Sequence, residues 1–164
     1  GHHEGNGCLF RVAPDGSTRV ISTKINQFPN GLAIDPAGAY LYIVLSNTAS
    51  VIRVPLLANG TVDDSQIETV AELPRTIPDG LAFDVEGNLY VSCYTPSRIY
   101  RVSPSGEVAL LVDDWECTQI AAPTNIAFGG ANMQTLFIAS LSRWHLAKGD
   151  MPLAGAKLND PIIT

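Results

Sequence analysis

The segment Pro29-Asn30-Gly31-Leu32-Ala33-Ile34-Asp35 decides the fold, because it recurs twice further along the chain. The second copy is Pro78-Asp79-Gly80-Leu81-Ala82-Phe83-Asp84, and the third is Pro123-Thr124-Asn125-Ile126-Ala127-Phe128-Gly129. Each copy is followed by a turn and a second apolar stretch. The copies are about 45 to 50 residues apart, a period typical of architectures in which each repeat is one supersecondary unit. The recurrence therefore predicts a repeat fold.

Short apolar stretches bounded by glycine and proline turns fill most of the chain, a pattern typical of β-strands. Propeller blades contain four antiparallel strands and repeat at roughly this interval, whereas the coils of a parallel β-helix are much shorter. The sequence therefore predicts an all-β fold, a β-propeller of four-stranded antiparallel blades. The predicted strands lie near residues 8–12, 18–22, 31–35, 40–45, 50–55, 67–72, 80–84, 88–93, 98–103, 108–113, 125–129 and 135–140.

The predicted strands group into about three blades, which is half of a six-bladed ring. Two blades are complete, at about 31–72 and 80–113, and half-blades stand before and after them, at 8–22 and 125–140. Residues 1–6 are interpreted as an expression-tag remnant or a disordered start. Residues 7–147 are then a partial propeller, and residues 148–164 are predicted to be an irregular tail.

Composition excludes several classes of protein. The chain is 46% hydrophobic and 16% charged, so it is predicted to be globular, and its net charge is -6. Its basic residues are scattered rather than clustered, so no nucleic-acid partner is expected. No apolar run approaches the roughly 20 residues that span a bilayer, so no membrane partner is expected. Cytoplasmic and periplasmic locations both stay open.

The second position of the repeat changes from Asn30 to Asp79 to Thr124, while the apolar frame around it is kept. Each of these residues precedes the innermost strand of its blade, so the three positions are expected to converge near the propeller axis. A carboxylate and an amide carbonyl are hard oxygen donors of the kind that Ca²⁺ or Mg²⁺ prefers. The alternative is that Asn-Gly and Asp-Gly simply form the turn into the strand. Thr124 offers only a hydroxyl and is predicted to be a wall residue.

Other polar residues have simpler interpretations. Asp35 and Asp84 end the same strands and are predicted to cap turns. His145 follows the last predicted strand and could act as a base, but no serine or cysteine partner motif accompanies it.

The three repeated stretches, with Gly87-Asn88-Leu89-Tyr90-Val91 after the second and Gly129-Gly130 ending the third, resemble the senescence marker protein/gluconolactonase (regucalcin-like) family. The resemblance covers about residues 7–147 and matches the C-terminal half of the family's fold. It implies a six-bladed propeller with a divalent cation on its axis, usually Ca²⁺, with Mg²⁺, Zn²⁺ and Mn²⁺ as alternatives. It also implies that Asn30 and Asp79 are metal ligands.

The same resemblance implies hydrolysis of lactones or related esters, with Asp79 as the catalytic residue that could accept a proton from the attacking water. The family's metal-binding Glu comes from an early blade and has no counterpart in this sequence. Activity is therefore expected only in a completed ring. The alternative is a non-catalytic propeller half that serves binding or assembly, or a truncated remnant.

Two partners could complete such a ring. In a homodimer, the outer strand pair of one copy would finish the inner pair of the other, and two copies would give six blades. The other candidate is an N-terminal half that supplies the remaining blades. A small lactone or ester is the expected ligand in either case.

Overall fold

The computed structural model describes residues 6–158, and these form thirteen β-strands and no helix. The strands pair with their neighbours in sequence, always antiparallel, into four separate sheets. The predicted all-β fold is thus confirmed. Because every pairing joins consecutive strands, each sheet is a simple meander, which is the construction of a propeller blade.

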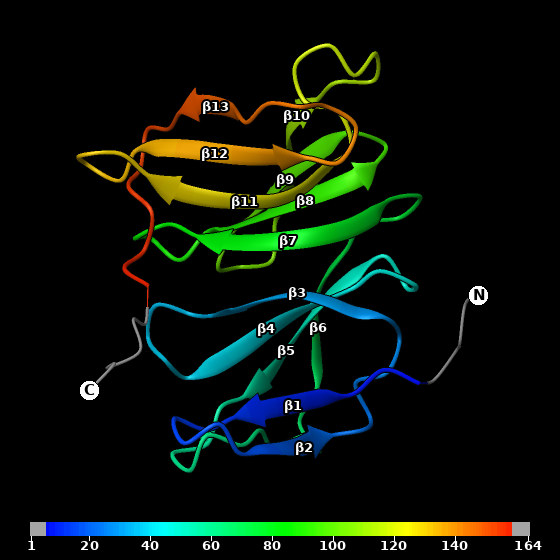
Figure 1. Cartoon of the computed structure of the whole chain (residues 1–164), viewed down its shortest axis with the longest axis vertical. Coiled ribbons are helices and arrows are strands. Elements are labelled where there is room, and N and C mark those ends of the chain that lie inside the picture. The colour runs from blue at the N-terminus through cyan, green and yellow to red at the C-terminus, as the bar shows by residue number, and fades with distance from the viewer. Residues whose placement is uncertain (1–5, 159–164) are drawn as a thin grey trace.

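The two central sheets have four strands each, and the outer two sheets have fewer (Figure 1). The sheets, in chain order, consist of β1 (Leu9–Val12) and β2 (Thr18–Ser22); β3 (Pro29–Ile34), β4 (Tyr40–Leu45), β5 (Ser50–Pro55) and β6 (Glu68–Glu72); β7 (Ile77–Phe83), β8 (Leu89–Thr95), β9 (Arg98–Val102) and β10 (Val108–Asp113); and β11 (Pro123–Gly129), β12 (Thr135–Ser140) and β13 (Ala147–Asp150).

The three repeated stretches form β3, β7 and β11, the first strands of their sheets. These strands lie side by side, β3 against β7 and β7 against β11, across the face seen in Figure 1. The remaining strands of each sheet extend away from this face. The repeat therefore builds the inner wall of the arc, as expected for the innermost strands of propeller blades.

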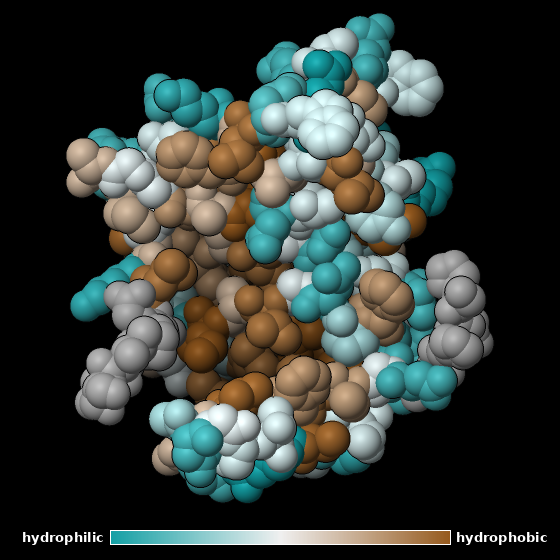
Figure 2. Space-filling view, in the orientation of Figure 1, coloured by the Kyte–Doolittle hydropathy of each residue, from teal (hydrophilic) through white to brown (hydrophobic). Residues whose placement is uncertain are grey.

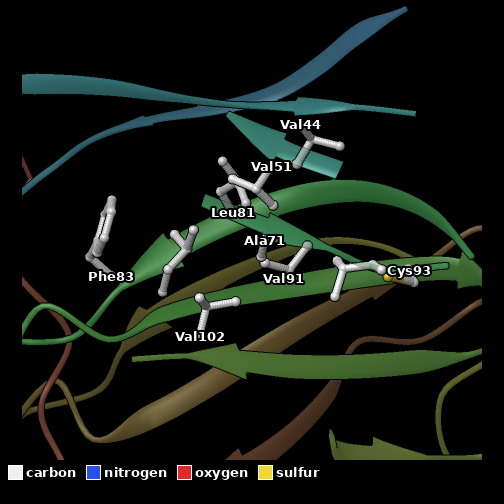
Figure 3. Packing of buried hydrophobic residues seen from close by; sticks show 10 residues of the cluster. Val44, Val51, Ala71, Leu81, Phe83, Val91, Cys93 and Val102 are labelled. Atoms are coloured by element: carbon white, nitrogen blue, oxygen red, sulfur yellow. The ribbon is translucent and has the colours of Figure 1, made fainter. Parts of the chain in front are cut away.

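The hydrophobic core lies between successive sheets rather than within any one of them. Between the two central sheets, Val44 and Val51 pack towards Leu81 and Val91 (Figure 3). Similar clusters fill the spaces between the first and second sheets and between the third and fourth sheets. Each sheet is thus held by apolar burial against its neighbours, the dominant favourable contribution to folding.

One aromatic contact repeats from sheet to sheet. Tyr42 meets Phe83 of the next sheet edge-on, with ring centroids 5.0 Å apart, and Tyr90 meets Phe128 in the same way at 5.3 Å. These tyrosines occupy equivalent positions in β4 and β8. The contacts show that the repeat encodes packing between blades as well as within them.

The C-terminal segment is more ordered than the sequence analysis predicted. Residues 148–164 were expected to be an irregular tail, but Ala147–Asp150 forms β13, which pairs with β12. Beyond it, the chain returns to the end of β7, where the Ala156 N–H donates to the Phe83 carbonyl at 2.9 Å. The sequence Lys148-Gly149-Asp150 has no apolar alternation, so its strand conformation depends on pairing with β12. Residues 1–5 and 159–164 lie outside the described residues. The prediction of a tag remnant or disordered start at residues 1–6 therefore falls outside them except at Asn6.

Candidate metal and substrate site

The candidate site lies where β3, β7 and β11 begin. Asn30, Asp79 and Thr124 occupy equivalent places there, and each is partly exposed. In β3 and β7 the register with the second strand shifts directly after the proline, between Pro29 and Leu32 and between Pro78 and Leu81. These bulges leave the Asn-Gly and Asp-Gly pairs outside the regular ladder. Bulges of this kind re-aim side chains and are common beside functional sites.

Glycine at the third position of the repeat brings adjacent blades close together. A Cβ on Gly31 would overlap the carbonyl oxygen of Asp79, and a Cβ on Gly80 would lie 2.6 Å from the carbonyl oxygen of Thr124. Real Cβ atoms do not approach other atoms so closely. The missing side chains therefore allow the backbone that carries Asp79 to lie directly against the backbone that carries Asn30.

The structure brings Asn30 and Asp79 together, as the predicted convergence requires. The backbone of Asp79 lies against Gly31, the residue that follows Asn30. Burial raises the pKa of the Asp79 carboxyl, and the nearby Asn30 amide offsets only part of that rise, so the pKa stays above its ordinary value. A carboxyl with a raised pKa is a better proton acceptor than an exposed one.

Two serines that the sequence analysis did not select hold this region in place. Ser46, which follows β4, donates from Oγ to the Pro78 carbonyl at 2.7 Å, and the Asn30 Nδ2 lies 3.4 Å from the same Oγ. Ser92 in β8 donates to the Thr124 carbonyl at 2.9 Å. Both hydroxyls thus tie one blade to the repeat of the next blade. Ser92 carried a usable signal, since it is polar within the apolar strand Leu89–Thr95, whereas Ser46 looks like an ordinary turn residue.

The other polar candidates have structural roles or lie in loops. Asp35 accepts hydrogen bonds from the backbone N–H groups of Ala39 and Tyr40, at 2.7 and 2.8 Å, so it caps the turn as predicted. Asp84 is fully buried, and its partners include the Tyr90 hydroxyl at 3.0 Å. His145 is exposed in the loop between β12 and β13.

The donor atoms fit part of a divalent-cation site. Asn30 and Asp79 supply an amide and a carboxylate, the hard oxygen donors that suit Ca²⁺. Within residues 6–158, however, no three His, Cys, Asp or Glu side chains gather where they could hold an ion. Calcium usually takes about six to eight oxygen ligands. These two side chains therefore account for only part of a coordination shell.

An apolar groove lies along the inner wall, and its lining does not include Asn30, Asp79 or Thr124. It has a volume of about 520 Å³ and is lined mainly by β3, β7, β11 and the segment after β13, including Leu32, Ile34, Ala82, Phe128 and Met133. Figure 2 shows apolar residues gathered in the middle of this face. Leu32 is 53% exposed, so the inner wall is open to solvent in the single chain.

Within residues 6–158, no helix has the length and apolar character needed to span a membrane.

The stacked meanders and the repeated inner strands define the blades of a β-propeller. The family model described as "SMP-30/Gluconolactonase/LRE-like region" matches residues 1–142. The chain therefore belongs to the SMP-30/gluconolactonase/LRE-like family, which confirms the resemblance.

Individual relatives agree with this assignment. The chain is 31% identical over 157 residues to a 6-deoxy-6-sulfogluconolactonase of Pseudomonas putida, covering 91% of this chain and 50% of that protein. The structure of regucalcin from Agrobacterium tumefaciens, described as a calcium-binding protein, superposes with a TM-score of 0.72 at 18% identity, covering 94% of this chain and 55% of that one. A gluconolactonase from Xanthomonas campestris gives a TM-score of 0.65 at 23% identity, with coverages of 81% and 41%. The chain spans about half the length of the curated relatives it matches.

Proposed function

We propose that this chain forms part of a metal-dependent hydrolase of sugar lactones or related esters. The observation that carries the proposal is the close approach of the Asn30-Gly31 and Asp79-Gly80 backbones, which places an amide and a carboxylate side by side at the starts of β3 and β7. The lactonase names of relatives such as the Pseudomonas putida protein support the reaction class. The calcium-binding description of the Agrobacterium protein supports Ca²⁺ as the cation, ahead of Mg²⁺, Zn²⁺ or Mn²⁺.

Asn30 and Asp79 would hold the cation in this proposal. A bound divalent cation supplies Lewis-acid stabilisation for the negative charge that develops on a carbonyl oxygen during ester hydrolysis. Asp79 has a second proposed role, as the acceptor of a proton from water; burial raises the pKa of its carboxyl in the metal-free chain, and a bound cation would lower that pKa, so the ligand role is the primary one.

A complete site requires a further arc of propeller in this proposal. The two side chains leave most of a calcium shell to be supplied from elsewhere. The inner wall is also uncovered, and soluble proteins rarely leave a large apolar surface exposed. A second arc facing β3, β7 and β11 would meet both needs.

Calcium-dependent thermal stabilisation tests the metal assignment. A ligand that binds only the folded state stabilises it by mass action, by about 2.7 kcal/mol at a concentration of 100 Kd. In the isolated chain, water can fill the ligand positions that the missing arc would supply. Calcium should then raise the melting temperature of the wild type and of the control Asp150→Ala, which alters an exposed carboxylate on β13. Asp79→Ala should show no rise. An equal rise in the wild type and in Asp79→Ala would show that the ion binds elsewhere.

A further inference from the structure

Ser46 makes two contacts that link the two residues of the candidate site. It is 8% exposed and stands directly after β4. Its Oγ donates to the Pro78 carbonyl at 2.7 Å, and Pro78 immediately precedes Asp79. The same Oγ is the partner of the Asn30 Nδ2, at the long distance of 3.4 Å.

The single proton of Ser46 fixes which end of the Asn30 amide can face it. A serine hydroxyl has one proton to donate and otherwise only accepts hydrogen bonds. Because the Pro78 carbonyl is an acceptor at 2.7 Å, that proton is committed there. Ser46 can therefore only accept from Asn30. The amide must present its NH₂ group, and the opposite orientation would place two acceptors against each other.

Asp79 is compatible with this orientation. An ionised carboxylate only accepts hydrogen bonds, so an Asn30 amide that lowers the pKa of the Asp79 carboxyl does so through its NH₂ group. The Asn30 Oδ1, the atom through which an asparagine binds a hard cation, is turned away from Ser46 by the contacts of the Ser46 hydroxyl.

We propose that Ser46 is a positioning residue that fixes the Asn30 side-chain amide with Nδ2 towards the Ser46 hydroxyl and thereby keeps Oδ1 free for a divalent cation. The proposal rests on the proposed function, because a free Oδ1 matters only if a cation binds there. Outer partners that orient metal ligands typically change metal affinity by about 10- to 100-fold when they are removed.

A Ser92 variant can distinguish the orientation of Asn30 from the general role of a serine hydroxyl in joining two blades. Its Oγ donates to the Thr124 carbonyl and accepts from the Gly80 N–H at 3.1 Å, so it joins β8 to the inner strands much as Ser46 joins β4 to β7. It has no hydrogen bond to Asn30. Ser92→Ala therefore removes an inter-blade hydrogen bond and the hydrogen bond from the Gly80 N–H but no contact to Asn30, whereas Ser46→Ala removes an inter-blade hydrogen bond together with the contact to the amide.

The test compares Ser46→Ala with Ser46→Thr, Ser92→Ala and Ser140→Ala. Ser140 is a useful control because its Oγ is buried without a hydrogen-bond partner in the part of the chain that the structure describes. The first measurement uses metal-free protein and follows the Asn30 side-chain ¹⁵N–¹H₂ signals by NMR. Ser46→Ala should shift these signals and speed their proton exchange. Ser46→Thr, which keeps an Oγ, should restore them, and the two other variants should leave them unchanged.

The second measurement is calcium titration by calorimetry. Ser46→Ala should weaken binding by about 10- to 100-fold, with Ser46→Thr close to the wild type. Asn30 signals that are the same in Ser46→Ala and the wild type would overturn the proposal whether or not calcium binds. Shifted signals together with no calcium binding by the wild type would support the positioning of Asn30 and would contradict the proposed function instead.

If Ser46→Ala does not fold, the wild type still decides the matter. The Nδ2 protons of Asn30 should exchange more slowly than those of Asn59, which lies exposed in the turn between β5 and β6. Equal exchange rates would overturn the proposal.

Discussion

Gly31 and Gly80 set the distance between the blades at the candidate site. Each lies where a Cβ would collide with the backbone of the next repeat, at Asp79 in the first case and at Thr124 in the second. Backbone atoms cannot rotate away as a flexible side chain can. The separation between Asn30 and Asp79 thus depends on the absence of one methyl group.

Gly31→Ala should therefore destabilise the fold and separate the polar pair. Overpacking of a tight contact typically costs about 1–3 kcal/mol. The matched control is Gly149→Ala on β13, where a Cβ would meet nothing within 4 Å. Urea unfolding should show a lower midpoint for Gly31→Ala and little change for Gly149→Ala. Equal midpoints would mean that the first two inner strands can separate without cost.

At this scale the sequence predicted the ligand candidates but not what orients them. Asn30 and Asp79 stood out because they vary within a constant apolar frame. Ser46 had no such signal, since its role comes from the Pro78 carbonyl of another blade. Contacts of this kind depend on how the blades pack, which residue spacing does not reveal.

At the scale of elements, the loop between β10 and β11 is organised by one carboxylate. Asp114 is buried and accepts hydrogen bonds from the backbone N–H groups of Gln119 and Ile120, both at 2.7 Å, and of Thr118 at 3.0 Å. Burial alone would raise the pKa of Asp114, but the backbone hydrogen bonds outweigh it and lower the pKa to about 2. This loop leads into β11 and so determines where Thr124 lies.

The lowered pKa of Asp114 predicts a specific acid sensitivity. A carboxyl whose pKa is lower in the folded state stabilises the fold above its ordinary pKa of about 3.9. That stabilisation is lost as the pH falls towards the folded-state value of about 2. Asp114→Asn should therefore melt below the wild type at pH 5 and above, and the difference should shrink towards pH 2. A difference that does not change with pH would show that the charge is not what holds the loop.

The strands themselves were largely predictable. All twelve predicted strands have counterparts, because apolar runs alternate with Gly- and Pro-containing turns. β13 was missed because Lys148, Gly149 and Asp150 are polar or flexible and are exposed in the structure. Such a strand depends on the edge of β12 rather than on its own composition, so local propensity could not reveal it.

At the scale of the whole molecule, the open inner wall raises the question of what completes the ring. A second copy would have to place its β1 and β2 beside β11 and β12. β13 already occupies the place next to β12, so the shared blade would contain five strands rather than four. The position that is glycine in the first two repeats is also Asn125 in the third. A closely packed copy of β3 would collide with that side chain, as it would with a Cβ on Gly31 or Gly80.

We therefore propose that a different polypeptide arc, rather than a second copy, completes this propeller. The purified chain should then form no discrete closed dimer, since β13 and Asn125 both obstruct one. Light scattering coupled to size exclusion should show no stable species at twice the 17.5 kDa of the chain at micromolar concentration. Any association through the exposed groove should be concentration-dependent and should weaken in Leu32→Glu, which places a charge on its apolar wall. A dimer that persists on dilution and is unaffected by Leu32→Glu would instead show that two copies close the ring by displacing β13.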